Sequence, residues 1–136
     1  LLDFIYRRIY RPRVPSVRGY HDWLAAGFAD PSTWSRHTQQ LRDIVSVCAR
    51  SGVTLRVAVL PFLRTSGDRF RASEIQARVS GFFAGESIQT VDLLPTIEGR
   101  DITHLVVNSG DAHPNAECHE LFAEAIWRAF YAAGGP

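Results

Sequence analysis

The residues most suited to catalysis are Asp111 and His113, which are two positions apart near the end of the chain. A histidine accepts the proton of a hydroxyl nucleophile most effectively when a carboxylate fixes its tautomer and stabilises the imidazolium that forms. Asp111 can supply that carboxylate, and Pro114 stiffens the backbone directly after the base. The pattern therefore predicts a general base at His113 that is oriented by Asp111.

A structural role for the same residues is the main alternative. Asp, His and Asn are ordinary loop residues before a proline, so Asp111 and His113 could simply cap the helix that follows them. The segment from Gly110 to Asn115 is predicted to be a loop immediately before that helix. In open α/β sheets, ligands bind beyond the carboxyl ends of the strands, where such loops lie. This placement suits a catalytic site.

A metal site is a second chemistry that these residues could support. Five side chains of ligand type lie near one another in the sequence: His104, Asp111, His113, Cys118 and His119. However, His113 and His119 are six positions apart, whereas paired ligands on a helix favour a spacing of four. Cys48 and Cys118 fit no metal or redox spacing and are predicted to be small core residues. Glycine-rich phosphate motifs are absent as well, so we predict neither a metal nor an organic cofactor.

Charge and hydropathy limit the classes of partner. The fifteen cationic residues are all Arg, and fourteen acidic residues leave a net charge of +1. A nucleic-acid-binding domain is usually more basic, so we predict no nucleic acid partner. Five arginines near the start could meet phosphates or an anionic glycan, or could lie along the surface of a short amphipathic helix: Arg7, Arg8, Arg11, Arg13 and Arg18. No apolar run reaches the roughly 18 residues that span a bilayer.

The first half of the chain contains one clear helix and one clear strand. From Asp30 to Arg50, apolar residues recur every three or four positions, which predicts a helix. Asp30 and Pro31 are typical of a helix start, and Gly52 is a typical stop. Residues 53–60 are nearly all apolar or β-branched. They predict a strand that is buried on both faces, as in a parallel sheet.

The second half repeats this order. Apolar residues at helical spacing precede Gly85, namely Ile75, Val79, Phe82 and Phe83. Residues 87–94 predict a second strand, residues 105–107 form a weak apolar run, and the last helix is predicted over about 114–132. The alternation of helix and strand favours an α/β fold with a parallel sheet. Because such a sheet is small and the chain contains no Met, we expect residues 1–136 to be a single, truncated domain.

Several segments resemble the C-terminal part of the SGNH (GDSL) hydrolases. The likeness is carried by residues 91–95 (VDLLP), 105–107 (LVV), 111–116 (DAHPNA) with His119, and 123–126 (AEAI), and it extends upstream to Trp34 and residues 57–61 (VAVLP). These enzymes carry an Asp-x-x-His or Asp-x-His pair followed by Pro-Asn. The resemblance implies that His113 is the general base, that Asp111 orients it, and that the chain belongs to a three-layer α/β/α flavodoxin-like parallel sheet. The chain departs from the family in its two-residue Asp-His spacing, since three is commoner, and in Cys118, where the family often has Gly.

The resemblance also implies a serine nucleophile that this chain lacks. The family places it in an N-terminal Gly-Asp-Ser motif and takes further oxyanion donors from intermediate blocks. Here Ser66 and Ser109 only stand in the reverse order of that motif, and there is no G-x-S-x-G elbow. The implied function is a serine esterase or O-deacylase acting on a small-molecule or carbohydrate ester, with the isolated chain inactive. An acyltransferase on the same scaffold and a non-catalytic α/β binding module are the alternatives, and both a cytoplasmic and an exported location stay open.

Overall fold

The computed structural model describes residues 20–63, 69–108 and 111–132. The chain divides between Gln39 and Gln40 into two compact units, and the helix over residues 31–50 runs across this boundary. The predicted arginine cluster and the two serines of the reversed motif lie outside the described residues: Arg7, Arg8, Arg11, Arg13, Arg18, Ser66 and Ser109.

The first unit contains α3 (Tyr20–Ala29) and the start of α4 (Pro31–Arg50). Asp30 caps α4, because its Oδ2 accepts hydrogen bonds from the Ser32 hydroxyl and the Thr33 backbone N–H, each at 2.6 Å. These bonds favour the carboxylate and lower the pKa of Asp30 to about 2. At the other end of α4, Gly52 has a φ of +65°, as a helix stop requires. The predicted helix is confirmed, whereas α3 was not predicted.

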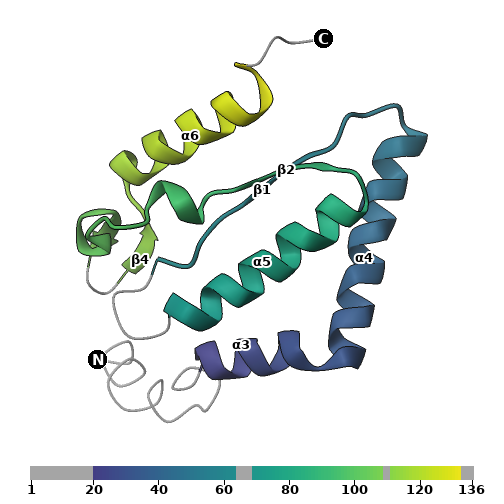
Figure 1. The fold of residues 1–136 in the computed structure, drawn as a ribbon, viewed down its shortest axis with the longest axis horizontal. Coiled ribbons are helices and arrows are strands. Elements are labelled where there is room, and N and C mark those ends of the chain that lie inside the picture. Colours follow the sequence, from purple (N-terminus) through teal and green to yellow (C-terminus); the bar gives the residue numbers. More distant parts are fainter. Residues whose placement is uncertain (1–19, 64–68, 109–110, 133–136) are drawn as a thin grey trace, which may run out of the picture. The chain divides into compact units, whose positions relative to one another are not determined.

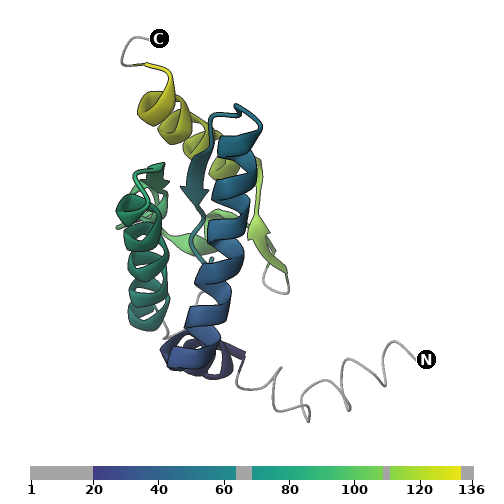
Figure 2. The same ribbon diagram turned by 90° about the vertical axis from the view of Figure 1, so that its right-hand side faces the viewer.

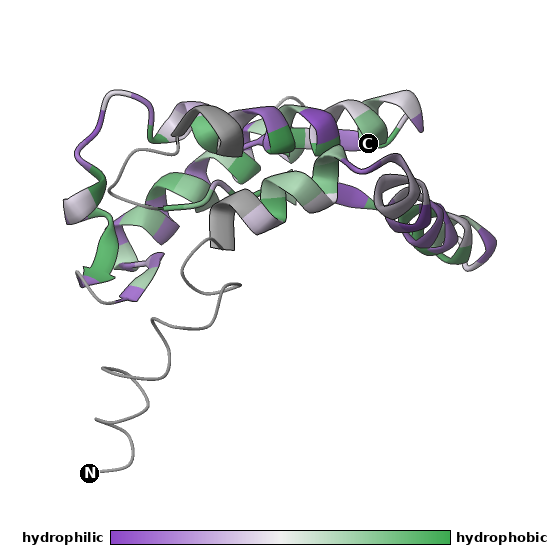
Figure 3. Ribbon diagram, turned by 90° about the horizontal axis from the view of Figure 1, so that it is seen from below, coloured by the Kyte–Doolittle hydropathy of each residue, from purple (hydrophilic) through white to green (hydrophobic). Residues whose placement is uncertain are grey.

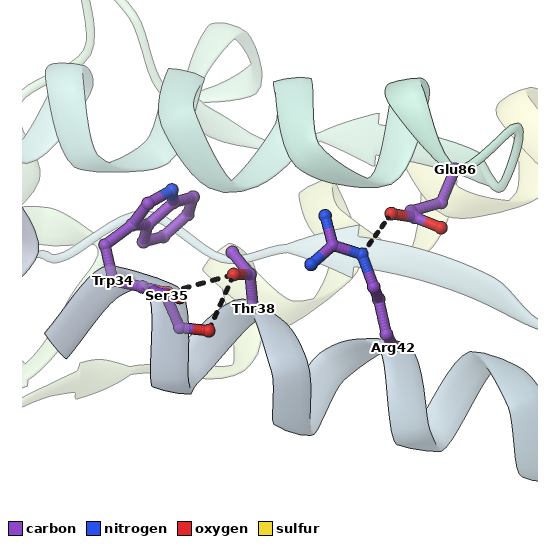
Figure 4. Close-up of polar contacts among 5 residues, drawn as sticks. All are labelled: Trp34, Ser35, Thr38, Arg42 and Glu86. Carbon is purple, nitrogen blue, oxygen red and sulfur yellow. Dashed lines mark hydrogen bonds and ion pairs between the residues drawn. The ribbon is translucent and has the colours of Figure 1, made fainter. Parts of the chain in front are cut away.

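At the beginning of α4, a buried threonine hydroxyl bonds to the helix's own backbone, and aromatic rings pack against one another. Thr38 is buried, and its hydroxyl is 3.0 Å from the carbonyl oxygens of both Trp34 and Ser35 (Figure 4). A helical threonine can satisfy its hydroxyl in this way without a partner from another element. Phe28, Trp34 and His37 form an aromatic cluster with ring centroids 5.7 to 5.9 Å apart. This cluster packs α3 against the first turns of α4.

The second unit is built on a strand, a helix and a second strand: β1 (Arg56–Val59), α5 (Arg69–Gly85) and β2 (Gln89–Asp92). The strands pair in parallel, with Ala58 opposite Val91, which confirms the predicted pairing. Both strands are shorter than predicted. The expectation that the first strand is buried on both faces is wrong, because all four β1 residues are half-buried and Val53 and Leu60 beside it are 57% and 54% exposed. Within the described residues, β2 covers only one edge of β1.

The chain continues through two short 3-10 helices and a hairpin to the last helix: η3 (Leu94–Thr96), η4 (Ile102–His104), β3 (Val106–Asn108), β4 (Asp111–Pro114) and α6 (Ala116–Phe130). The strands β3 and β4 pair antiparallel. The expected loop before the last helix is therefore wrong for residues 111–114, because β3 offers them a pairing partner. The last helix is confirmed, and the protein is a mixed α/β protein.

The core of the second unit joins α6 to the β1–β2 pair. Its most deeply buried side chains are Leu93, Leu105 and Cys118, and Ala58 and Val91 of the strands pack against the same cluster. The prediction of a small core residue is confirmed for Cys118, where burial raises the pKa of the thiol, but not for Cys48, which is only half-buried on α4. Figure 1 shows α5 and α6 on either side of the strand pair. The α6 helix thereby acquires a fixed position relative to the sheet.

The second half of α4 is attached to the end of α5 by Arg42. Its Nε donates to Oε1 of Glu86 at 2.8 Å, and its guanidinium carbon lies 5.2 Å from the centroid of the Phe82 ring. Figure 4 shows the ion pair, and Figure 2 shows the ribbons of the second unit from another side. A partly exposed pair of this kind contributes about 1 kcal/mol or less.

Among the described residues, no helix combines the length and apolar character needed to cross a bilayer.

Candidate functional site

Asp111 and His113 lie on β4, where strand geometry places residues two positions apart on the same face. The pairs Asn108–Asp111 and Val106–Pro114 join this strand to β3. Figure 3 shows the hydrophobic start of β3 beside the hydrophilic residues of β4. On such a backbone, a spacing of two residues brings the acid and the base together.

The carboxylate of Asp111 contacts His113 twice through the same oxygen. Its Oδ1 lies 2.5 Å from the ring Nδ1 and accepts a hydrogen bond from the backbone N–H at 3.1 Å. Because a carboxylate only accepts hydrogen bonds, this contact assigns the ring proton to Nδ1 in the neutral imidazole. The lone pair of a neutral His113 is therefore on Nε2, on the far side of the ring from Asp111.

Both side chains are open to solvent. The exposed fraction is 87% for the His113 side chain and 44% for that of Asp111. No hydroxyl among the described residues is hydrogen-bonded to His113, so Nε2 is accessible to a group brought from outside this part of the chain. The arrangement provides an oriented proton acceptor.

The pKa of Asp111 is lowered below its ordinary value. The hydrogen bond from the His113 backbone N–H is the main cause, and the bond from the His113 ring adds to it. Both bonds stabilise the charged carboxylate. Asp111 is therefore ionised at neutral pH, as an orienting acid must be if it is to stabilise a protonated imidazole.

Asn115, rather than Asp111 or His113, caps the last helix. Its Oδ1 accepts from the backbone N–H of Cys118 at 3.0 Å, so the capping alternative for Asp111 and His113 is wrong. Asn115 was not among the predicted site residues, although an Asn directly before an amphipathic helix is a recognisable cap signal. The Asp111 carboxylate instead forms its hydrogen bonds with the backbone and ring of His113.

The other predicted ligand-type residues do not join this pair. His104 lies on η4 with its Nε2 3.7 Å from Oδ2 of Asp101. Cys118 points into the core, and His119 is exposed on α6. Within the described part of the chain, no three His, Cys, Asp or Glu side chains are grouped so that they could hold a metal ion.

No protein-family model, curated protein or solved structure matches the chain. Functional inference therefore rests on the geometry of the Asp111–His113 pair and on the sequence motif that contains it. The resemblance to the SGNH hydrolases remains a prediction from that motif.

Proposed function

We propose that this chain supplies the acid–base pair of an SGNH-type serine esterase or O-deacylase. The observation that carries the proposal is the 2.5 Å contact between Asp111 Oδ1 and His113 Nδ1, together with the exposure of the imidazole. This is the arrangement that general-base catalysis requires, because the acid holds one ring nitrogen and the other is available to a nucleophile.

In the proposed reaction, His113 Nε2 accepts the proton of a serine hydroxyl as the serine oxygen bonds to the ester carbonyl carbon. The protonated ring then returns this proton to the leaving alcohol oxygen as the ester C–O bond breaks. Water repeats the sequence to release the acid. Asp111 stays ionised throughout and stabilises the transient imidazolium. The serine and the oxyanion donors come from residues outside those described, and no metal or organic cofactor is required.

The proposal also assigns the strand pair β1–β2 to a three-layer α/β/α flavodoxin-like sheet. A parallel pair joined through a helix is the unit from which such sheets are built. Helices flank the pair on both sides (Figure 1). Within the described residues, β2 pairs with one edge of β1, so the backbone of the other edge could pair with a further parallel strand.

The test is ester hydrolysis by the complete protein, the His113→Ala variant and the matched His104→Ala variant, with p-nitrophenyl acetate as the substrate. Removal of the base is expected to lower kcat by about 10⁶-fold. His104→Ala removes an exposed imidazole next to another aspartate and is expected to retain activity within about two-fold. Full activity in His113→Ala would reject the mechanism. An intact protein with no hydrolysis or acyl transfer would favour the non-catalytic binding module.

A further inference from the structure

Asn115, the residue directly after β4, forms several hydrogen bonds to other parts of the second unit, in addition to the pairing of β4 with β3. Its backbone N–H donates to the carbonyl of Leu105 at 3.0 Å, and its side-chain Nδ2 donates to the carbonyl of His104 at 2.7 Å. A longer contact of 3.4 Å joins Nδ2 to the carbonyl of Val106. These three carbonyls belong to consecutive residues that run from the end of η4 into β3.

Two of the three residues whose carbonyls Asn115 contacts are buried. Leu105 and Val106 are buried in the core. On the other side, the Asn115 Oδ1 accepts from the N–H of Cys118, which is fully buried. One amide side chain thus connects the end of β4 both to the core segment beneath it and to α6. Both halves of the amide are used: the oxygen for the helix cap and the nitrogen for the strand.

We infer that Asn115 is the positioning residue of the Asp111–His113 pair. His113 is separated from Asn115 by Pro114, whose ring fixes one backbone torsion, so a shift of Asn115 is passed along the strand to the imidazole. The inference rests on the proposed function, because a position matters only if His113 acts as a base. A small displacement of a catalytic group can reduce turnover strongly, by about 100-fold for 1 Å.

The two halves of the amide can be separated by substitution. Asp and Ser are both good helix caps, so Asn115→Asp and Asn115→Ser keep an acceptor for the Cys118 N–H. Both variants lack the Nδ2 donor to the carbonyls of His104 and Val106. A purely structural cap predicts that they behave like the parent, whereas a positioning role predicts that they disturb His113. The Ser variant has no charge and controls for the added carboxylate of the Asp variant.

The direct readout is the tautomer of the neutral His113 ring. The complete protein would be labelled with ¹⁵N-histidine, and the His113 signals would be assigned by their loss in His113→Ala. The bond to Asp111 holds the proton on Nδ1, whereas a free histidine favours Nε2–H. We therefore expect Nδ1–H to predominate in the parent and to become the minor form in both Asn115 variants. The kcat is expected to fall by about 10- to 100-fold with little change in KM.

Gln76→Ala is the control for a general loss of stability. Gln76 is buried, and its Nε2 donates to the Val59 carbonyl at 3.1 Å and to Asp92, far along the chain from β4. This variant should lower Tm and leave the His113 tautomer unchanged. A parent without an Nδ1–H excess would remove the basis of the proposed function itself. If the parent shows an Nδ1–H excess and both Asn115 variants retain it, the positioning role of Asn115 is overturned, while the proposed function is not.

Discussion

Two aspartate–histidine pairs lie close together in the sequence of the second unit, and they differ in which ring nitrogen meets the carboxylate. In the Asp111–His113 pair, Oδ1 is 2.5 Å from Nδ1. In the Asp101–His104 pair, Oδ2 is 3.7 Å from Nε2. The first arrangement leaves Nε2 outward for a substrate or nucleophile, whereas the second directs the same atom at the acid. Only the first pair has the geometry of an oriented base.

The difference arises from the backbone that carries each pair. Asp101 is the N-cap of η4, and its Oδ1 accepts from the backbone N–H and the hydroxyl of Thr103 at 2.9 and 2.8 Å. The Asp111 Oδ1 instead accepts from the backbone and ring of His113. A 3-10 turn uses its aspartate to hold the helix, whereas a strand leaves its aspartate to the side chain two positions on. Proximity of Asp to His in the sequence therefore does not by itself identify a catalytic pair.

Among the variants that compare the two pairs, the largest expected effect is the difference in activity between the two aspartate substitutions. In the complete protein, Asp111→Asn should reduce kcat for ester hydrolysis by about 10³- to 10⁴-fold, because the amide can stabilise the wrong tautomer of His113 and does not stabilise the imidazolium. Asp101→Asn keeps an N-cap acceptor and should leave kcat within about two-fold of the parent. Steady-state hydrolysis of a chromogenic ester measures both values.

An equal loss of activity in the two Asn variants would contradict the comparison, because it would mean that the pairs act alike. Thermal unfolding of each variant provides the control. Both substitutions are nearly isosteric, so a reduction in kcat at unchanged Tm can be assigned to the chemistry of the site.

A smaller effect is expected on stability, and here the substitution of Asp101 should be more harmful than the substitution of Asp111. Asp101→Ala removes the cap of η4, which begins at the buried residue Ile102. Loss of an N-cap costs about 0.5–1 kcal/mol, which corresponds to a few degrees in Tm for a domain of this size. Asp111→Ala removes exposed bonds on a strand and should change Tm less. Differential scanning calorimetry of the two variants compares them directly, and a larger Tm loss for Asp111→Ala would reverse our assignment of roles.

The identity of the candidate pair was predictable from the sequence, but its geometry was not. Asp111 and His113 could be singled out because an acid two positions before a histidine is a local signal. The strand that aligns them depends on pairing with Val106 and Asn108, and four residues of mixed polarity do not reveal that partner. The role of Asn115 was equally hidden, because its contact with the His104 carbonyl spans eleven positions.

The same distinction between local and non-local signals applies to the fold. The start of α4 was predictable because Asp30 and Pro31 encode a cap locally. The α3 helix was missed because its sequence is nearly continuously apolar over residues 23–29 and lacks a helical period. For β1, the apolar sequence predicted burial on both faces, yet burial depends on neighbours that the strand sequence does not specify.

The smallest expected effect concerns the titration of Asp111. Its pKa in the folded chain is lowered, so the contribution of the carboxylate to stability is present above the ordinary pKa and is lost as the pH falls through the lowered value. In His113→Ala the ring bond is removed, but the backbone N–H of residue 113 still donates. Because that N–H is the main cause of the shift, the Asp111 pKa should rise only part of the way to its ordinary value.

The pKa of Asp111 in the variant can be measured from its carboxyl ¹³C chemical shift as a function of pH. A full return to the ordinary value would mean that the imidazole, rather than the strand backbone, holds the acid in place, and the contrast with the capping acid Asp101 would then depend on the ring alone.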